Sequence, residues 1–126
     1  MRRLISSDSP YEAILGYSRA VVQGDWCFVS GSTGADPLTR EIPESLEDQA
    51  RNTMTTIGAA LEQAGFTLND VVRATYYLTS RDDIERVTPM LGEMFRAIRP
   101  AATMLLVSGL IHPRMKIEIE VTAFRG

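Results

Sequence analysis

A chain of 126 residues, 44% of them hydrophobic, suits one domain spanning residues 1–126 that is large enough to bury a core of its own. Lys and Arg number 13 and Asp and Glu 16, so the net charge of −3 provides no broad cationic field, and we expect no nucleic-acid partner. With one cysteine, one histidine and no apolar run near the roughly 18 residues of a membrane span, the sequence predicts a cytoplasmic protein without an intrachain disulfide, a Cys/His zinc site or a membrane-spanning segment.

The first predicted elements are two short strands, residues 18–22 and 26–30, which are rich in apolar and β-branched side chains. The connection Gln23-Gly24-Asp25 has the length of a hairpin loop, so we expect the two strands to pair antiparallel. Residues 31–37 follow as a loop of small residues, where the backbone either approaches a ligand closely or simply turns.

A long helix is predicted next, opened by Pro43 and Ser45 and ended by Gly65. Its apolar stripe consists of Leu46, Ala50, Met54, Ile57, Leu61 and Ala64. A second helical pattern covers residues 82–98. Proline inside a helix loses a hydrogen bond and clashes with the preceding turn, so we expect Thr88 to cap a new helix with Pro89 at its first position.

A strand over residues 71–79 is expected to place Val72, Ala74, Tyr76 and Leu78 on one face and Arg73, Thr75 and Tyr77 on the other. Strands over residues 103–107 and 116–124 complete the pattern, and the last one alternates apolar residues with Glu118 and Glu120. This order predicts an α+β domain with two helices on one face of a mixed sheet. The other face is polar, and it either meets water, as composition favours, or packs against another subunit.

Several segments together resemble the Rid (YjgF-type) family of imine and enamine deaminases over almost the whole chain. They are Leu15-Gly16-Tyr17-Ser18, Val29-Ser30-Gly31, Pro100-Ala101-Ala102-Thr103 and Ile117-Glu118-Ile119-Glu120. The resemblance implies the chorismate-mutase-like Rid fold and a homotrimer whose sheets form a central barrel, with a cleft for a small-molecule metabolite between subunits. It therefore favours a packed rather than a solvated second sheet face. It also implies hydrolysis without a cofactor or a metal.

The resemblance assigns the catalytic role to Glu118, which would hold the attacking water. A carboxylate can orient water and take up its proton as the oxygen attacks an electrophilic carbon. The residues that would shape the substrate-binding cleft are Tyr17, Ser30, Gly31, Thr88, Ala102 and Thr103. Five of these residues also have an ordinary structural interpretation: Glu118 as a charged side chain on a polar sheet face, Tyr17 as a structural tyrosine, Ser30 and Gly31 as a turn, and Thr88 as a helix cap.

Ala102 stands where the family carries the arginine that grips the substrate carboxylate. Losing one partner of such a desolvated pair costs ~2–5 kcal/mol. We expect strand alternation to turn Arg99 to the opposite face. Arg114, in the loop before the last strand, is a second candidate to reach the cleft, but nothing in the spacing requires it to do so. Two hypotheses follow: a deaminase acting on something other than the usual 2-imino acids, with little activity on 2-iminopropanoate, or a non-catalytic ligand-binding or regulatory trimer.

Overall fold

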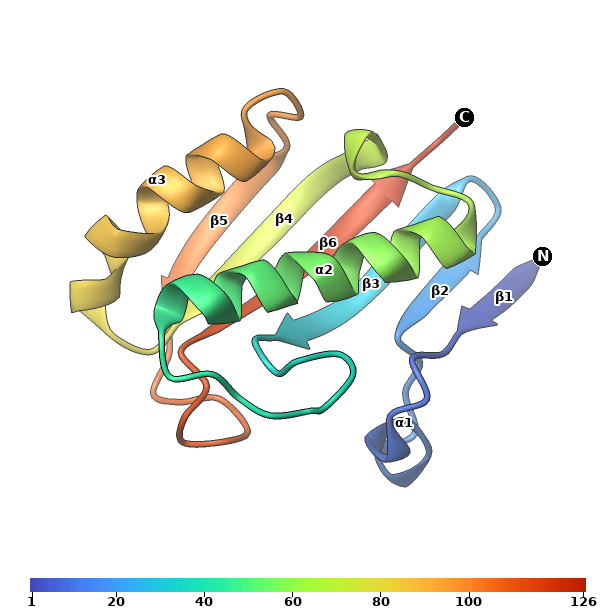
Figure 1. The fold of residues 1–126 in the computed structure, drawn as a ribbon. Helices are drawn as coiled ribbons and strands as arrows, with labels where there is room; N and C mark the ends of the chain where they lie inside the picture. Colours follow the sequence, from blue (N-terminus) through green and yellow to red (C-terminus); the bar gives the residue numbers. More distant parts are fainter.

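The computed structural model describes residues 1–126 and shows an α+β fold built on one six-stranded sheet (Figure 1). The strands are β1 (Arg2–Ile5), β2 (Ala20–Gln23), β3 (Trp26–Thr33), β4 (Val71–Leu78), β5 (Ala101–Leu106) and β6 (Ile117–Phe124). They lie in the order β1-β2-β3-β6-β4-β5, and only β4 and β5 pair in parallel. The predicted mixed sheet is therefore confirmed.

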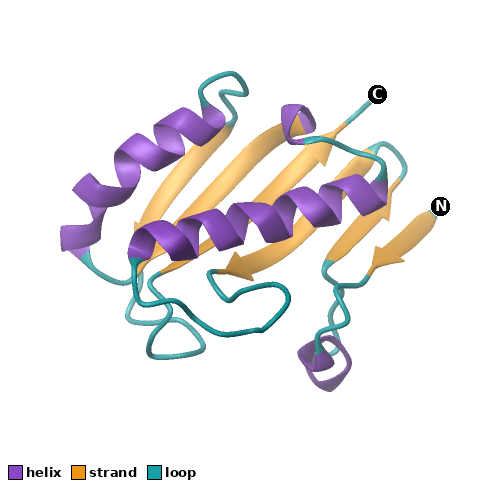
Figure 2. Ribbon diagram, viewed as in Figure 1, coloured by secondary structure: helices purple, strands orange, loops and turns teal.

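The two long helices, α2 (Leu46–Ala64) and α3 (Ile84–Phe95), cover the same face of this sheet, as predicted (Figure 2). Between the helices and the strands lies the core, where Ile57 of α2, Val87 of α3 and Ile117 of β6 have no exposed surface. Because side chains alternate along a strand, burial of Ile117 and Ile119 places Glu118 and Glu120 on the opposite face.

Helix α2 begins and ends where the sequence predicts. The Ser45 hydroxyl accepts a hydrogen bond of 3.1 Å from the backbone N–H of Asp48, and Gly65 ends the helix in the left-handed conformation at φ 85°. No helix in the chain combines the length and the apolarity needed to cross a membrane.

Helix α3 continues through Pro89, so the prediction that Thr88 caps a new helix is wrong. The helix begins after Asp83, and the Thr88 hydroxyl donates to the Ile84 carbonyl one turn earlier, 2.6 Å away. Proline removes one backbone hydrogen bond, but the apolar face of α3 is buried against the sheet on both sides of Pro89. Tertiary packing of this kind stabilises a helix more than local propensity does.

Two strand details differ from the prediction. Strand β3 continues to Thr33, so residues 31–33 are strand rather than loop. In β4, Val71 is buried and Val72 is 43% exposed, because the pairing with β6 shifts between Val71 and Arg73. A shift of one residue moves a side chain to the other face of the sheet.

The N-terminal residues form two elements that the sequence pattern did not predict, the edge strand β1 and helix α1 (Pro10–Leu15). Both are short, and α1 buries none of its residues, so neither produces a periodic apolar stripe. In Figure 1, α1 lies outside the sheet, beyond the ends of β1 and β2. Gly16 ends α1 at φ 73° and leads the chain into Tyr17.

The sheet face opposite the helices is uncovered in a single chain and carries exposed apolar groups. Trp26 lies 6.3 Å from Phe28 and 4.7 Å from Phe124, measured between ring centres. All three rings stay exposed, and so does Leu105 of the edge strand β5, at 44%. Contiguous exposed apolar surface of this kind marks a site of interaction.

Candidate functional site

Glu118 lies half-buried in β6 on the uncovered face, paired in register with Thr33 of β3 and Tyr77 of β4. Its carboxylate packs against Gly31, where an added Cβ would come within 1.9 Å of Glu118 Oε2. Burial raises the pKa of Glu118; Arg19 opposes that rise and Glu120 adds to it. The carboxyl group therefore exchanges its proton closer to neutral pH than an ordinary glutamate, which suits a general base.

Glu120 has a different environment although it lies only two residues away. The Tyr77 hydroxyl donates a hydrogen bond to Glu120 Oε1, and this bond raises the pKa of Tyr77 to about 12. Glu120 is thereby tied to a phenol, whereas no hydrogen bond from this chain contributes to the pKa of Glu118. The two carboxylates of the Ile-Glu-Ile-Glu segment are thus distinguished by their neighbours.

A bulge in β3 brings Gly31 to Glu118. The pairing with β6 passes from Val29 opposite Val121 to Ser32 opposite Ile119, so that Ser30 and Gly31 together occupy the space of one residue. The Ser30 hydroxyl donates to the Ser18 carbonyl, 2.6 Å away, which ties the bulge to the neighbouring chain segment. Ser30 and Gly31 therefore lie at an irregularity within a strand and not in the turn that the sequence predicted.

A hollow of about 290 Å³ opens beside Glu118. It is lined by Gly31, Tyr77, Val107, Gly109, Leu110, Glu118 and Glu120. The loop that follows β5 supplies one wall, and it is held to the sheet by a 2.9 Å hydrogen bond from the Val107 N–H to the Leu78 carbonyl. The volume is at the lower end for ligand pockets, so it suits a small metabolite.

Behind the Gly31 wall lies a buried cation, Arg19, which is only 9% exposed. Its Nη2 donates to the Gly31 carbonyl at 2.6 Å, and its guanidinium lies 5.7 Å from the ring centre of Tyr17. Sequence analysis missed this residue. One feature of the sequence could have indicated it: Arg19 directly precedes the strand in which Ala20 and Val22 are the apolar positions, so strand alternation places its side chain on the face opposite to theirs.

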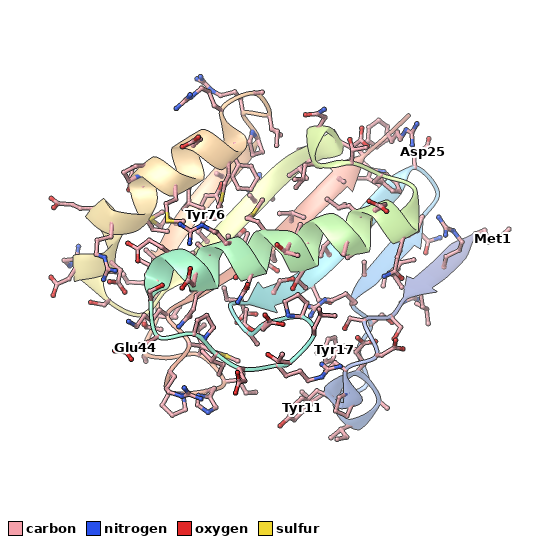
Figure 3. The ribbon with its side chains drawn as sticks, viewed as in Figure 1. Met1, Tyr11, Tyr17, Asp25, Glu44 and Tyr76 are labelled. Carbon is pink, nitrogen blue, oxygen red and sulfur yellow. The ribbon has the colours of Figure 1, made fainter.

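Tyr17 contacts the site only through Arg19. It is half-buried next to α1, far from Tyr76, which lies between α3 and the sheet (Figure 3). Tyr17 does not line the hollow beside Glu118. Of the predicted site residues, the structure therefore brings together Gly31 and Glu118, with Ser30 adjacent and Tyr17 in an outer position.

The predicted residues of β5 are not part of this hollow. Ala102 pairs with Ala74, which is buried beneath the helices, so Ala102 shares the helix-covered face. Thr103 pairs with Thr75 and belongs to the uncovered face, but it does not line the hollow. Within one chain, Ala102 and Glu118 therefore lie on opposite faces of the sheet.

Thr88 lines a second, larger hollow of about 480 Å³ between α3 and β5. Its other lining residues are Tyr76, Leu91, Gly92, Phe95, Arg96, Arg99, Pro100 and Met104. Met104 is two residues from Ala102 and lies on the same face of β5. Because Arg99 lines the same hollow as Met104, the expectation that Arg99 is turned away from the face of Ala102 is wrong. Arg99 precedes β5 in a left-handed conformation, φ 54°, and strand alternation does not apply to it. Arg114 is held elsewhere, donating to the Ile42 carbonyl at 3.3 Å.

Known proteins share both the sequence pattern and this fold. Residues 7–125 match the family described as Endoribonuclease L-PSP. A 2-iminobutanoate/2-iminopropanoate deaminase from Capra hircus is 32% identical, and the match covers 100% of this chain and 92% of the goat protein. A YjgF/YER057c/UK114 family member from Mycobacterium tuberculosis is 37% identical, with a TM-score of 0.90 over 99% of this chain and 100% of that structure. Escherichia coli TdcF, solved with bound serine, is 28% identical, with a TM-score of 0.79 over 98% of this chain and 94% of that structure.

Proposed function

Because this chain belongs to the endoribonuclease L-PSP family, which includes the Rid and YjgF proteins, we propose that it hydrolyses a small imine or enamine to a carbonyl compound and ammonia. As a member of this family it is a protein of the reactive-intermediate deaminase type. The finer proposal is that Glu118 positions the attacking water. The observation that supports it is that the Glu118 carboxylate is half-buried, has a raised pKa, packs against Gly31 and lines the small hollow together with it.

The reaction places specific demands on Glu118. For an imine, R₂C=NH + H₂O gives R₂C=O + NH₃. The carboxylate takes a proton from water as the oxygen bonds to the imine carbon, and it passes this proton to the imine nitrogen, which yields the carbinolamine R₂C(OH)NH₂ and the free carboxylate. Glu118 then takes the hydroxyl proton and delivers it to the amino group, and the C–N bond breaks as the C=O bond forms, with loss of ammonia. Proton transfer by a positioned group of this kind contributes about 10²- to 10⁴-fold in rate.

Ala102 supports a substrate other than the usual 2-imino acids. The methyl side chain offers no charge and no hydrogen bond to a carboxylate, and a lost charge-paired contact costs ~2–5 kcal/mol. We therefore propose that activity on 2-iminopropanoate is weak or absent. The same observation favours a second candidate, a non-catalytic ligand-binding or regulatory protein that retains the hollow without the chemistry.

The proposal includes a cytoplasmic homotrimer with its ligand cleft between subunits. The exposed cluster of Trp26, Phe28 and Phe124 supports an interface on the uncovered face. The chain has a single cysteine, Cys27, and cysteine usage of this kind favours a reducing compartment. Light scattering on the purified protein tests the assembly, and a monomer would contradict it.

Ribonuclease activity is not part of the proposal, despite the family description. Two carboxylates, Glu118 and Glu120, line the hollow and would repel a phosphate backbone, and the chain has a net charge of −3. We expect no tight, salt-dependent binding of RNA. A steep decrease of RNA affinity with rising salt concentration would contradict this expectation.

The deciding experiment measures ammonia release from a panel of imines and enamines with and without a carboxylate group. Turnover that the Glu118→Gln variant loses supports the enzyme. A folded protein that binds members of the panel but accelerates none of them supports the non-catalytic alternative. A ligand-bound structure then shows which groups of the hollow contact the molecule.

A further inference from the structure

We propose that Arg19 is a positioning residue for Glu118, holding the Gly31 bulge against the carboxylate and supplying the positive charge that faces it. The inference rests on the proposed function, because it concerns how the water-activating carboxylate is held. Arg19 does not line the hollow, so it acts through its neighbours and not by touching the substrate.

The contacts of Gly31 carry the geometric part of the proposal. Arg19 Nη2 binds the Gly31 carbonyl at 2.6 Å, and Glu118 Oε2 lies directly against the Gly31 Cα, where a Cβ would be 1.9 Å away. Arg19 and Glu118 therefore meet the same residue. At the bulge, Ser30 and Gly31 have no regular pairing with β6. The hydrogen bond from the Arg19 guanidinium therefore holds a part of the β3 backbone that its pairing with β6 does not hold.

The burial of Arg19 shows that its position is costly. The residue is 9% exposed, and its Nε is buried without a hydrogen-bond partner. The ion pairs of the chain are Arg51–Asp48, Arg86–Glu47 and Arg86–Asp83, so no carboxylate lies within 4.0 Å of the Arg19 guanidinium. A buried charge without an ion-pair partner is costly to a fold, and groups of this kind cluster at functional sites.

The charges around Glu118 carry the electrostatic part. Glu120 on β6 disfavours ionisation of Glu118, and Tyr77 on β4 stays neutral because its pKa is raised to about 12. Arg19 alone lowers the pKa of Glu118. Arg19 also contributes, as the smallest of several causes, to the lowered pKa of Glu12 of α1, and it forms an ion pair with neither carboxylate. Removal of Arg19 would leave Glu118 facing only a like charge.

The test uses the full-length protein and the variant Arg19→Met, which keeps an apolar stem of similar length. If Arg19 favours the ionised carboxylate, the acid limb of the kcat/KM profile moves to higher pH. The ratio of activity at pH 6 to activity at pH 8 is then expected to fall by roughly 3- to 10-fold. Arg81→Met, which removes an equal charge from an exposed site, is expected to leave the profile unchanged.

A second variant keeps the proposal testable if Arg19→Met does not fold. Arg19→Lys retains the charge but not the fork that binds Gly31, so we expect a lower kcat with the acid limb at its wild-type pH. A lysine variant whose acid limb moves upward would overturn the role of the charge. An Arg19→Met variant that is only less stable, with an unchanged profile, would do the same.

A titration without substrate separates this inference from the proposed activity. The ¹³C signal of the Glu118 carboxyl, assigned by its loss in Glu118→Gln, is followed against pH by NMR. We expect its midpoint to be higher in Arg19→Met than in the wild type, whether or not any imine is turned over. Identical midpoints would overturn the inference even if the enzyme proves active.

Discussion

Ala102 and Glu118 lie on opposite faces of one sheet, in strands β5 and β6, with β4 between them. Ala102 shares its face with the buried Ala74, whereas Glu118 shares the other face with Tyr77. A ligand that touches both side chains therefore needs two chains, one presenting the α3–β5 side and the other presenting the Glu118 hollow. This separation supports the proposed cleft between subunits.

Replacing Ala102 with arginine is expected to raise kcat/KM for 2-iminopropanoate by about 30-fold or more. The guanidinium would supply the bidentate partner that the substrate carboxylate lacks, worth ~2–5 kcal/mol. Ala102 is exposed in the edge strand, so the larger side chain has room. Steady-state measurement of ammonia release checks the gain.

The matched control for this gain is Ala59→Arg, which adds the same charge to an exposed position of α2. It is expected to change nothing, because long-range attraction at a distance is screened by salt. A folded Ala102→Arg variant with no gain over Ala59→Arg would show that another group sets the substrate preference.

Glu118→Gln is expected to lower turnover by roughly 10²- to 10⁴-fold without destabilising the protein. Because the pKa of Glu118 is raised in the folded state, the native protein binds more protons than the unfolded chain between the ordinary glutamate pKa and the raised one. Stability therefore falls as pH rises through that window, and the loss persists at neutral pH. Thermal unfolding at neutral pH is expected to give a higher Tm for the variant, and the difference should vanish in acid.

The pH dependence of the wild type follows from the same shift. Activity needs ionised Glu118, so kcat/KM is expected to rise with pH through a midpoint above the ordinary glutamate range. A profile of kcat/KM measured in buffers of constant ionic strength locates this midpoint. An acid limb at or below the value for a free glutamate would argue that another group activates the water.

Gly31→Ala is expected to abolish most activity by displacing Glu118, since the new methyl group would lie 1.9 Å from its Oε2. The control is Gly58→Ala in α2, where nothing lies within 4 Å of the added methyl group. Alanine in a helix is preferred to glycine by roughly 0.5–1 kcal/mol, so Gly58→Ala should be more stable and equally active. Equal activity of Gly31→Ala and Gly58→Ala would show that the position of Glu118 does not matter for catalysis.

Tyr77→Phe is expected to lower stability at neutral pH, because it removes the hydrogen bond to Glu120, and the difference from the wild type is expected to shrink as pH rises above about 10. In the folded protein the Glu120 hydrogen bond raises the pKa of Tyr77 to about 12, whereas the unfolded value is about 10. Between these values the native state keeps a proton that the unfolded chain loses, so the free energy of unfolding falls as pH rises. Urea unfolding at pH 9 and at pH 11 should show a smaller decrease for Tyr77→Phe than for the wild type.

Sequence reasoning was sufficient for helix α2 and for the last strand, but not for β1 and α1. The apolar stripe of α2, its cap at Ser45 and its stop at Gly65 are local features, and local features fixed its ends. The alternation of Ile117, Ile119 and Val121 likewise predicted which face of β6 bears Glu118 and Glu120. Pro89 was misjudged because packing of α3 on the sheet outweighs a local rule.

The sequence by itself determined the main strands and helices after residue 18, the buried side of α2 and of the last strand, and the carboxylates of that strand, because these follow from periodicities of a few residues. Only the tertiary structure decided that a bulge places Gly31 against Glu118, that Arg19 lies buried behind it, and that Ala102 belongs to the other face. Those relations join segments up to about ninety residues apart. They depend on strand register, and a shift of one residue in register exchanges the two faces of a sheet.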